Sequence, residues 1–164
     1  MEAMASFEIR RAHQEDAEAI LTCLRCAFEA YRHAYTLEAF RDTVLCAETL
    51  EHRLQEMAIL VIAAESRVVG TVGYQAHGAE GHLRGMAVLP EWQGTGAASM
   101  LLHDAERELR RLGCKCVTLD TTEPLQAAIR FYEKHGFRAS GKIADFFGMR
   151  LYEYSKPLVI SAAD

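Results

Sequence analysis

The sequence contains no apolar run that approaches the roughly 20 residues of a membrane-spanning helix. Its first residues, Met1 to Met4, also lack the pattern of a secretory signal. We therefore expect no membrane partner and a cytoplasmic location.

Clusters of basic residues of the kind that follow a phosphate backbone are missing as well. The chain has 18 Lys and Arg against 23 Asp and Glu, a net charge of −5. Arg107, Arg110 and Arg111 are close in sequence, but they fall on the polar side of an expected helix. We expect no nucleic acid partner, and an acidic protein is compatible with a cationic substrate such as an amine.

The five cysteines do not form a disulfide or metal-binding pattern. Cys23 and Cys26 have the C-x-x-C spacing, but no second pair completes a set of ligands. Cys114 and Cys116 share one face of an expected strand, with no histidine nearby in sequence. We expect free thiols in a reducing compartment and no metal site.

The remaining composition is that of one soluble domain over residues 1–164. Half of the residues are apolar and a quarter are charged, and the chain has no repeats, low-complexity runs or long linkers. A domain of this length buries roughly two-thirds of its unfolded surface, so it needs no disulfide or metal to fold.

Hydrophobic periodicity predicts a strand at Phe7–Arg11 and a helix that begins near Gln14. Further helices are expected at residues 37–40, 50–57, 96–112 and 124–135, and further strands at residues 58–64, 68–74, 81–89, 117–119, 137–143 and 149–154. This order predicts a mixed α/β domain with one central sheet and helices on its faces.

A glycine-containing turn between the strand at residues 81–89 and the helix at residues 96–112 is the most informative segment. The first turn of a helix has free N–H groups and a partial positive charge. Gly94, Gly96, Ala97 and Ala98 are small enough for an anion to approach the main chain, as a pyrophosphate does. Two alternatives remain for this turn. It could bind nothing, or it could belong to a dinucleotide fold, although Ser99 stands where that fingerprint needs its third glycine.

Residues 88–98 resemble the acetyl-CoA motif of the GNAT N-acetyltransferase superfamily. That motif is Arg or Gln, two residues, Gly, one residue, then Gly or Ala, matched here by Gln93, Gly96 and Ala98. A second family motif is matched at residues 128–137, and the element order agrees over nearly the whole chain. The resemblance implies a mixed, mostly antiparallel sheet with helices on both faces, and acetyl-CoA as co-substrate.

The resemblance also implies which residues contact acetyl-CoA. Backbone groups on the strand before the turn would polarise the thioester, and Gly85 is a natural position for the bulge that separates this strand from its neighbour. The family often has Asn seven residues before its tyrosine, where this chain has Leu125, so one cofactor contact is in doubt. The expected cofactor-binding residues are Met86, Ala87, Val88, Gln93, Gly94, Thr95, Gly96, Ala97, Ala98, Ser99, Phe131 and Lys134.

Two residues are expected to move protons. Tyr132 matches the family's general acid, which protonates the leaving thiolate, although it could also be a tyrosine packed on the sheet. His82 is the first candidate for the base that deprotonates the amine, because an imidazole accepts a proton at neutral pH. A structural histidine is the alternative; Glu80 or a chain of waters could also serve as the base.

The acceptor pocket is expected between the first helices and the last strands. Phe28, Tyr31, Arg32 and Asp145 are its candidate substrate-binding residues, with Tyr35 and Phe146 as further lining. Arg32 could bind a substrate carboxylate, or it could be an ordinary surface residue.

These features predict an N-acetyltransferase that moves an acetyl group from acetyl-CoA to a primary amine of a small molecule, a protein or a peptide. The amine would attack directly in a ternary complex. The alternative is a non-catalytic acyl-CoA-binding or sensor module. Family members commonly dimerise through their terminal strands, so a homodimer is possible.

Overall fold

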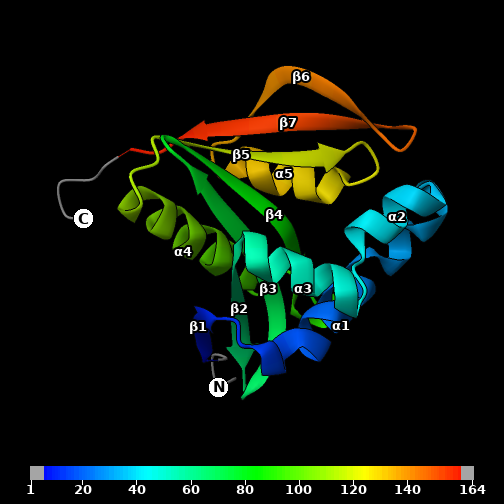
Figure 1. Ribbon diagram of the computed structural model, residues 1–164, viewed down its shortest axis with the longest axis vertical. Helices are drawn as coiled ribbons and strands as arrows, with labels where there is room; N and C mark the ends of the chain where they lie inside the picture. Colours follow the sequence, from blue (N-terminus) through cyan, green and yellow to red (C-terminus); the bar gives the residue numbers. More distant parts are fainter. Residues whose placement is uncertain (1–5, 160–164) are drawn as a thin grey trace.

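The computed structural model describes residues 6–159, which form a single seven-stranded sheet with the strand order β1-β2-β3-β4-β5-β7-β6 (Figure 1). The strands are β1 (Phe7–Arg11), β2 (Ala58–Ala64), β3 (Arg67–His77), β4 (Glu80–Val88), β5 (Cys116–Thr122), β6 (Arg138–Phe146) and β7 (Met149–Pro157). Only the β4–β5 pair is parallel. The mixed, mostly antiparallel sheet predicted from the sequence is confirmed.

The helices also follow the predicted order, with small shifts at their ends. They are α1 (Ala17–Phe28), α2 (Leu37–Thr43), α3 (Ala47–Glu56), α4 (Ala97–Arg111) and α5 (Gln126–Lys134), and short 3₁₀ segments cover Gln14–Asp16, Glu29–Ala34 and Pro90–Trp92. The Thr36 side chain caps α2, accepting a hydrogen bond from the Ala39 N–H at 3.2 Å.

The largest differences are at α1 and α3, which begin three residues away from the predicted starts, and side-chain hydrogen bonds explain both. The Asp16 carboxylate accepts the His13 N–H at 2.7 Å and pairs with Arg10, which holds residues 14–16 in a 3₁₀ turn before α1. The Thr49 hydroxyl accepts the Cys46 N–H at 2.9 Å. This contact makes Thr49 part of the first turn of α3, which begins three residues earlier than predicted.

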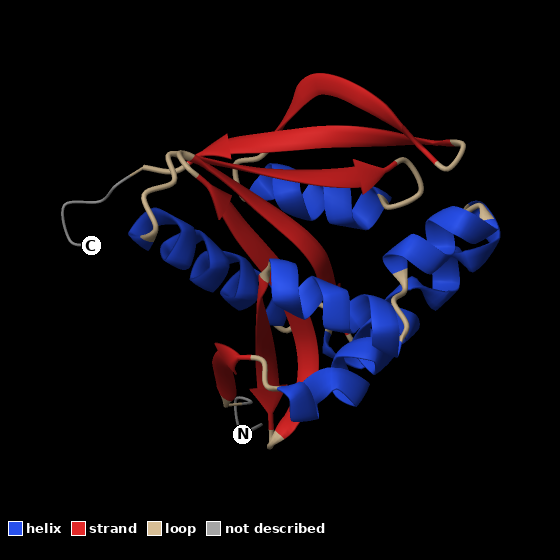
Figure 2. Ribbon diagram, in the orientation of Figure 1, coloured by secondary structure: helices blue, strands red, loops and turns tan. Residues whose placement is uncertain are grey.

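Helices cover both faces of the sheet (Figure 2). On one face α4 lies against β4, so closely that a Cβ at Gly81 would be 2.7 Å from the Leu109 Cδ1 atom. The other face is covered by α1, where Ile20 and Leu24 are buried beside Thr71 of β3. The core lies between these helices and the first four strands.

The sheet opens between β4 and β5. Gly85 has a φ of +69°, and the register between β3 and β4 shifts at this point, which is the β-bulge expected from the sequence. The strands β4 and β5 pair only from Glu80 to Leu83 and from Cys116 to Leu119. Beyond these residues the two strands separate from a common apex, as Figure 1 shows. The opening lies next to the bulge at Gly85, which the resemblance placed as the point where this strand separates from its neighbour.

Within residues 6–159, no helix is long and apolar enough to cross a membrane. In the same part of the chain, no three His, Cys, Asp or Glu side chains come together as a possible metal site. The five cysteines are free thiols, two of them buried, Cys23 and Cys114.

Candidate active site

The turn before α4 presents glycine main chain to open space. Gly94 and Gly96 have φ values of +76° and +94°, which glycine adopts without strain, and a Cβ built on either would meet no atom within 4 Å. Gly96 is the N-cap residue of α4, a helix of 15 residues. The sequence therefore places flexible, unobstructed backbone at the positive end of a long helix.

The amide groups of residues 94–99 fit a pyrophosphate. None of them donates a hydrogen bond to an acceptor within residues 6–159. Unpaired N–H groups at a helix N-terminus bind anions through both hydrogen bonds and the helix dipole. Because no side chain covers Gly94 or Gly96, an anionic group can reach these amides directly.

Side chains next to the turn hold it in place. The Gln93 Nε2 atom donates to the Val88 carbonyl at 3.0 Å, which ties the turn to the end of β4. The Ser99 Oγ and His135 Nε2 atoms are 3.1 Å apart and join α4 to α5. The His135 ring also packs on Phe131, with centroids 4.4 Å apart. Gln93, Ser99 and Phe131 thus support the shape of the turn in this structure, and Lys134 is exposed nearby on α5.

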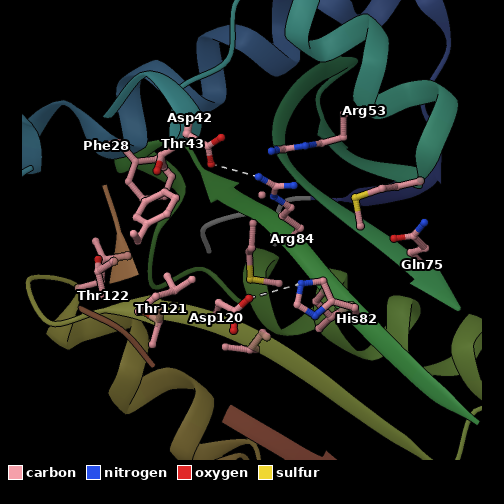
Figure 3. Close-up of a pocket in the computed structure, with 18 of the residues that line it drawn as sticks. Phe28, Asp42, Thr43, Arg53, Gln75, His82, Arg84, Asp120, Thr121 and Thr122 are labelled. Carbon is pink, nitrogen blue, oxygen red and sulfur yellow. Dashed lines mark hydrogen bonds and ion pairs between the residues drawn. The ribbon is translucent and has the colours of Figure 1, made fainter. Parts of the chain in front are cut away.

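A cavity of about 420 Å³ lies at the opening between β4 and β5. It is also bounded by the first helices and by β6 and β7, as the sequence analysis expected for the acceptor pocket. Figure 3 shows many of the side chains that line it. The residues that line the cavity are Phe28, Tyr35, Asp42, Thr43, Arg53, Glu56, Met57, Gln75, His82, Leu83, Arg84, Gly85, Met86, Leu119, Asp120, Thr121, Thr122, Leu125, Tyr132, Phe146 and Leu151.

His82 lies on the cavity wall, with its ring held by β5. The parallel register places His82 opposite Thr118, and the ring Nδ1 is 2.9 Å from the Thr118 Oγ1 atom. Burial lowers the pKa of His82 below its usual 6.5, although Asp120 opposes this shift. The ring is therefore neutral at pH 7. When Nδ1–H donates to Thr118, Nε2 keeps its lone pair and can accept a proton.

Asp120 faces the same ring from β5. Its Oδ2 atom is 3.8 Å from the His82 Nε2 atom, as the dashed line in Figure 3 marks. Alternation along β5 puts Asp120 on the same face as Thr118, one residue beyond the last pair with β4. Partial burial raises the pKa of Asp120, and His82 opposes that shift. The His82 ring and the Asp120 carboxylate thus form one small polar region of the cavity wall.

Tyr132 reaches the cavity from α5. Its ring packs edge-on against Phe131 and Phe137, with centroids 5.5 and 5.8 Å away. The hydroxyl makes no hydrogen bond within residues 6–159, and burial raises the pKa of Tyr132 to about 12. The phenol therefore stays protonated at neutral pH and has its proton available to a group in the cavity.

Two arginines occupy the end of the cavity near α2 and α3. The Arg84 Nη2 atom pairs with Asp42 at 3.1 Å. The Arg53 side chain extends from α3 toward this pair, as Figure 3 shows. Arg53 is 8% exposed.

The candidate acceptor residues separate into two groups. Phe28 lines the cavity, and so do Tyr35 and Phe146. Arg32 lies outside it, pairing with Glu29 at 3.0 Å and covering the Phe40 ring, so it has the surface role that the sequence left open. Tyr31 and Asp145 are also outside the lining. The Asp145 carboxylate instead accepts the Gly148 N–H at 3.5 Å in the turn between β6 and β7.

The remaining predicted cofactor residues lie on β4 and at the start of α4. Met86 lines the cavity, whereas Ala87 and Val88 are buried and pair with Thr71 and Gly70 of β3. Thr95 bonds back to the Trp92 carbonyl, Ala97 is buried, and Ala98 is partly buried. Leu125, which replaces the family's asparagine, is part of the cavity wall.

Asp120, Thr118 and Arg53 were not predicted from the sequence as residues of the site. A signal for Thr118 and Asp120 exists in their alternation on one strand face, but the register with His82 is needed to use it. For Arg53 the signal is its helical spacing from the buried Leu50, three residues earlier. That spacing turns an arginine toward the interior.

Solved structures of acetyltransferases share this fold. The PaiA N-acetyltransferase of Thermoplasma acidophilum, in complex with coenzyme A, is 22% identical, with a TM-score of 0.78 over 93% of this chain and 99% of that one. The ribosomal-protein-S18-alanine N-acetyltransferase of Escherichia coli is 18% identical, with a TM-score of 0.77 over 97% of this chain and 98% of that one. A ribosomal-protein-alanine N-acetyltransferase of Brucella melitensis is 24% identical, with a TM-score of 0.71 over 92% and 99%.

The profile of the acetyltransferase (GNAT) family matches residues 17–137, which include His82, the turn at residues 93–99 and Tyr132. With the exposed amides before α4 and the opening between β4 and β5, the match leads to one conclusion: the chain belongs to the GNAT family of acetyltransferases, whose co-substrate is acetyl-CoA.

Proposed function

We propose that this protein transfers the acetyl group of acetyl-CoA to a primary amine of a small molecule, a peptide or a protein, by direct attack within a ternary complex. The observation that carries the proposal is that one cavity is lined by Met86 of β4, by His82 and by Tyr132. The main chain that would polarise the thioester, the candidate base and the candidate acid therefore border the same cavity. Holding reactants in such a geometry is itself worth several kcal/mol of the barrier.

The residues that would hold acetyl-CoA follow from their exposure. The free amides of residues 94–99 fit the pyrophosphate, and the unpaired edges of β4 and β5 beyond Leu83 and Leu119 leave room for the pantetheine arm. When bound, acetyl-CoA supplies the thioester carbonyl that the amine attacks. The main chain of Met86, Ala87 and Val88 would orient that carbonyl.

His82 is the proposed base. A protonated amine has no lone pair, so it must lose a proton before it can attack. The neutral imidazole, anchored by Thr118 at 2.9 Å, can take this proton on Nε2. The adjacent Asp120 carboxylate attracts the ammonium form of the amine and stabilises the imidazolium once it forms.

Tyr132 is the proposed acid. The departing thiolate needs a proton, and the Tyr132 hydroxyl is protonated at neutral pH because burial holds its pKa at about 12. It also has no competing hydrogen bond within residues 6–159. Its proton is thus free for the sulfur.

A non-catalytic acyl-CoA-binding module is the second candidate function. The observation that favours it is Leu125, which puts an apolar wall where the family often has an asparagine contact with the cofactor. A sensor needs the turn at residues 93–99, to bind the pyrophosphate, but it does not need His82 or Tyr132 to transfer protons.

Release of free thiol from acetyl-CoA in the presence of an amine panel separates the two functions. We expect amine-dependent thiol release. Tight binding of coenzyme A without thiol release for any amine would contradict the enzyme and favour the sensor. We also propose a cytoplasmic location, supported by five cysteines that are all free thiols.

A further inference from the structure

Arg53 is a buried cation without an anionic partner. Its residue is 8% exposed, and within residues 6–159 its guanidinium makes no hydrogen bond and no ion pair shorter than 4 Å. A buried charged group without a partner destabilises the fold, and native proteins rarely keep one without a reason. Among residues 6–159 the Arg53 nitrogens are not fully buried atoms left without a partner, so the N–H donors of the guanidinium are open to the cavity that the residue lines.

The surroundings of Arg53 do not neutralise it. Burial is the main cause that lowers its pKa to about 10, and the neighbouring Arg84 lowers it further. Asp42 and Glu56 act in the opposite direction from a distance, but Asp42 is already paired with Arg84 at 3.1 Å. Arg53 therefore remains protonated at neutral pH and has no carboxylate of its own.

The bulge of β4 leaves room for the Arg53 guanidinium in this position. Gly85, at the bulge of β4, lies directly beside it, and a Cβ there would be 2.8 Å from the Arg53 Nη1 atom. Leu50, on the same helix face, is buried in the core and orients α3. The side chain is thus inserted between helix and bulge, where it lines the cavity.

The cavity wall assigns Arg53 to the acceptor rather than to the pyrophosphate. Arg53 shares the cavity with His82 and Asp120, and no residue of the turn at 93–99 is part of the described lining. An anion that reached Arg53 would therefore belong to the molecule whose amine lies near His82. Guanidinium groups bind carboxylates through two parallel, charge-assisted hydrogen bonds.

We propose that Arg53 binds a carboxylate of the acceptor, so that the acceptor is a small amine of the amino-acid type rather than a simple amine or polyamine. The proposal rests on the proposed acetyl transfer and adds the class of the acceptor. A cavity of about 420 Å³ is of the size that small ligands occupy. It offers positive charge at Arg53 and negative charge at Asp120, the complement of a molecule with one carboxylate and one ammonium group.

Matched pairs of amines test the proposal. Each pair has one member with a carboxylate and one without: lysine and cadaverine, 4-aminobutyrate and butylamine, phenylalanine and phenethylamine. Thiol release gives kcat/KM for each. We expect the carboxylate-bearing member of at least one pair to be preferred by about 10-fold or more, the range of a charged hydrogen bond. Equal or reversed preference in every pair would overturn the proposal.

Substitution of Arg53 identifies the group responsible. Arg53→Gln should reduce kcat/KM for the preferred amino acid about 10-fold to 100-fold, leave the plain amine within about threefold, and so abolish the preference. Arg53→Lys should retain part of it. The matched control is Arg107→Gln, since Arg107 is 65% exposed on α4 and pairs with Asp104. An equal loss for both members of a pair would instead assign Arg53 to the thioester and contradict the proposal.

A binding measurement separates this inference from acetyl transfer itself. N-acetyl amino acids with coenzyme A present should bind the wild-type protein and bind Arg53→Gln at least 10-fold more weakly, as titration calorimetry measures. If no amine is acetylated but this difference is found, the carboxylate site stands and the acetyl transfer fails. If amines are acetylated and the difference is absent, the carboxylate site fails. Arg53→Met, which keeps the length and apolar packing of the side chain, replaces Arg53→Gln in both assays if the latter unfolds.

Discussion

The Nε2 atom of His82 lies 3.8 Å from the Oδ2 atom of Asp120, too far for a direct hydrogen bond. Both residues line the cavity, at the point where β4 and β5 stop pairing: the last pair is Leu83 with Leu119. A single nitrogen between them can donate to both. The gap therefore suits an ammonium group that binds to Asp120 and gives its proton to His82.

His82→Gln should reduce kcat/KM about 10²-fold to 10³-fold, the usual contribution of a general base. In the proposed mechanism the neutral imidazole is the active form, so wild-type kcat/KM should fall as the pH drops through the pKa of His82. Burial puts that pKa below 6.5, and the acid limb should lie there. A profile from pH 5 to 9 measures it, and the variant should lack this limb.

Asp120→Asn and His33→Gln complete this test. The Asp120 charge raises the pKa of His82, so Asp120→Asn should move the acid limb to lower pH. His33 is exposed on the segment after α1, and His33→Gln should leave the profile unchanged. An unaltered acid limb in His82→Gln would mean that another group is the base.

Tyr132→Phe should lower kcat about 10²-fold while the affinity for coenzyme A stays the same. The substitution removes only the hydroxyl proton, because the ring packing against Phe131 and Phe137 is retained. Single-turnover rates and calorimetry measure the two quantities. Tyr74→Phe is the control: Tyr74 is 3% exposed but outside the cavity lining. An unchanged kcat in Tyr132→Phe would remove the general acid from the mechanism.

Hydrophobic periodicity and single glycines were sufficient to predict the helices and the β-bulge. The helical spacing of apolar residues such as Leu101 and Leu109 predicted α4, and both are buried in the structure. Gly85 predicted the bulge because an interior glycine permits irregular backbone. Strand ends were less accurate: β5 was predicted as three residues and has seven, from Cys116 to Thr122. The residues of β5 beyond the predicted strand pair with β7. Hydrophobic periodicity describes one segment at a time and cannot predict pairing between segments that are distant in the sequence.

The site residues that the sequence missed depend on register and burial. Asp120 lies beside the His82 ring only because β4 and β5 pair in parallel with His82 opposite Thr118. Arg53 and Arg32 are both helical arginines in sequence. In the structure Arg32 pairs with Glu29, three residues away, whereas Arg53 is buried without a partner among the described residues. Only the packing of α3 on the β4 bulge distinguishes them.

Arg10→Gln should reduce the free energy of unfolding at pH 7 by about 1–2 kcal/mol. Two hydrogen bonds from Arg10, at 2.7 and 2.9 Å, hold the pKa of the buried Asp16 at about 2. Because this pKa is below its ordinary value, the stabilisation is present above about pH 4 and is lost as the pH falls toward 2. Urea unfolding at several pH values measures the difference, which should shrink in acid. Arg32→Gln, at an exposed pair, should cost almost nothing; an equal loss there would contradict the assignment.

Gly96→Asp and Gly113→Asp, at the two ends of α4, test as a matched pair whether the turn at residues 93–99 binds the pyrophosphate. Both glycines have nearly the same φ, +94° and +92°, and a Cβ at either meets no atom within 4 Å, so the backbone strain is comparable. Only Gly96 lies among the free amides that would hold the pyrophosphate, where a carboxylate adds repulsion. We expect Gly96→Asp to weaken coenzyme A binding at least 10-fold and Gly113→Asp to leave it within about twofold, since a like charge near an anion costs more than one kcal/mol. Calorimetric titration gives both affinities, and thermal unfolding confirms that each variant is folded. Equal affinities would place the pyrophosphate away from this turn.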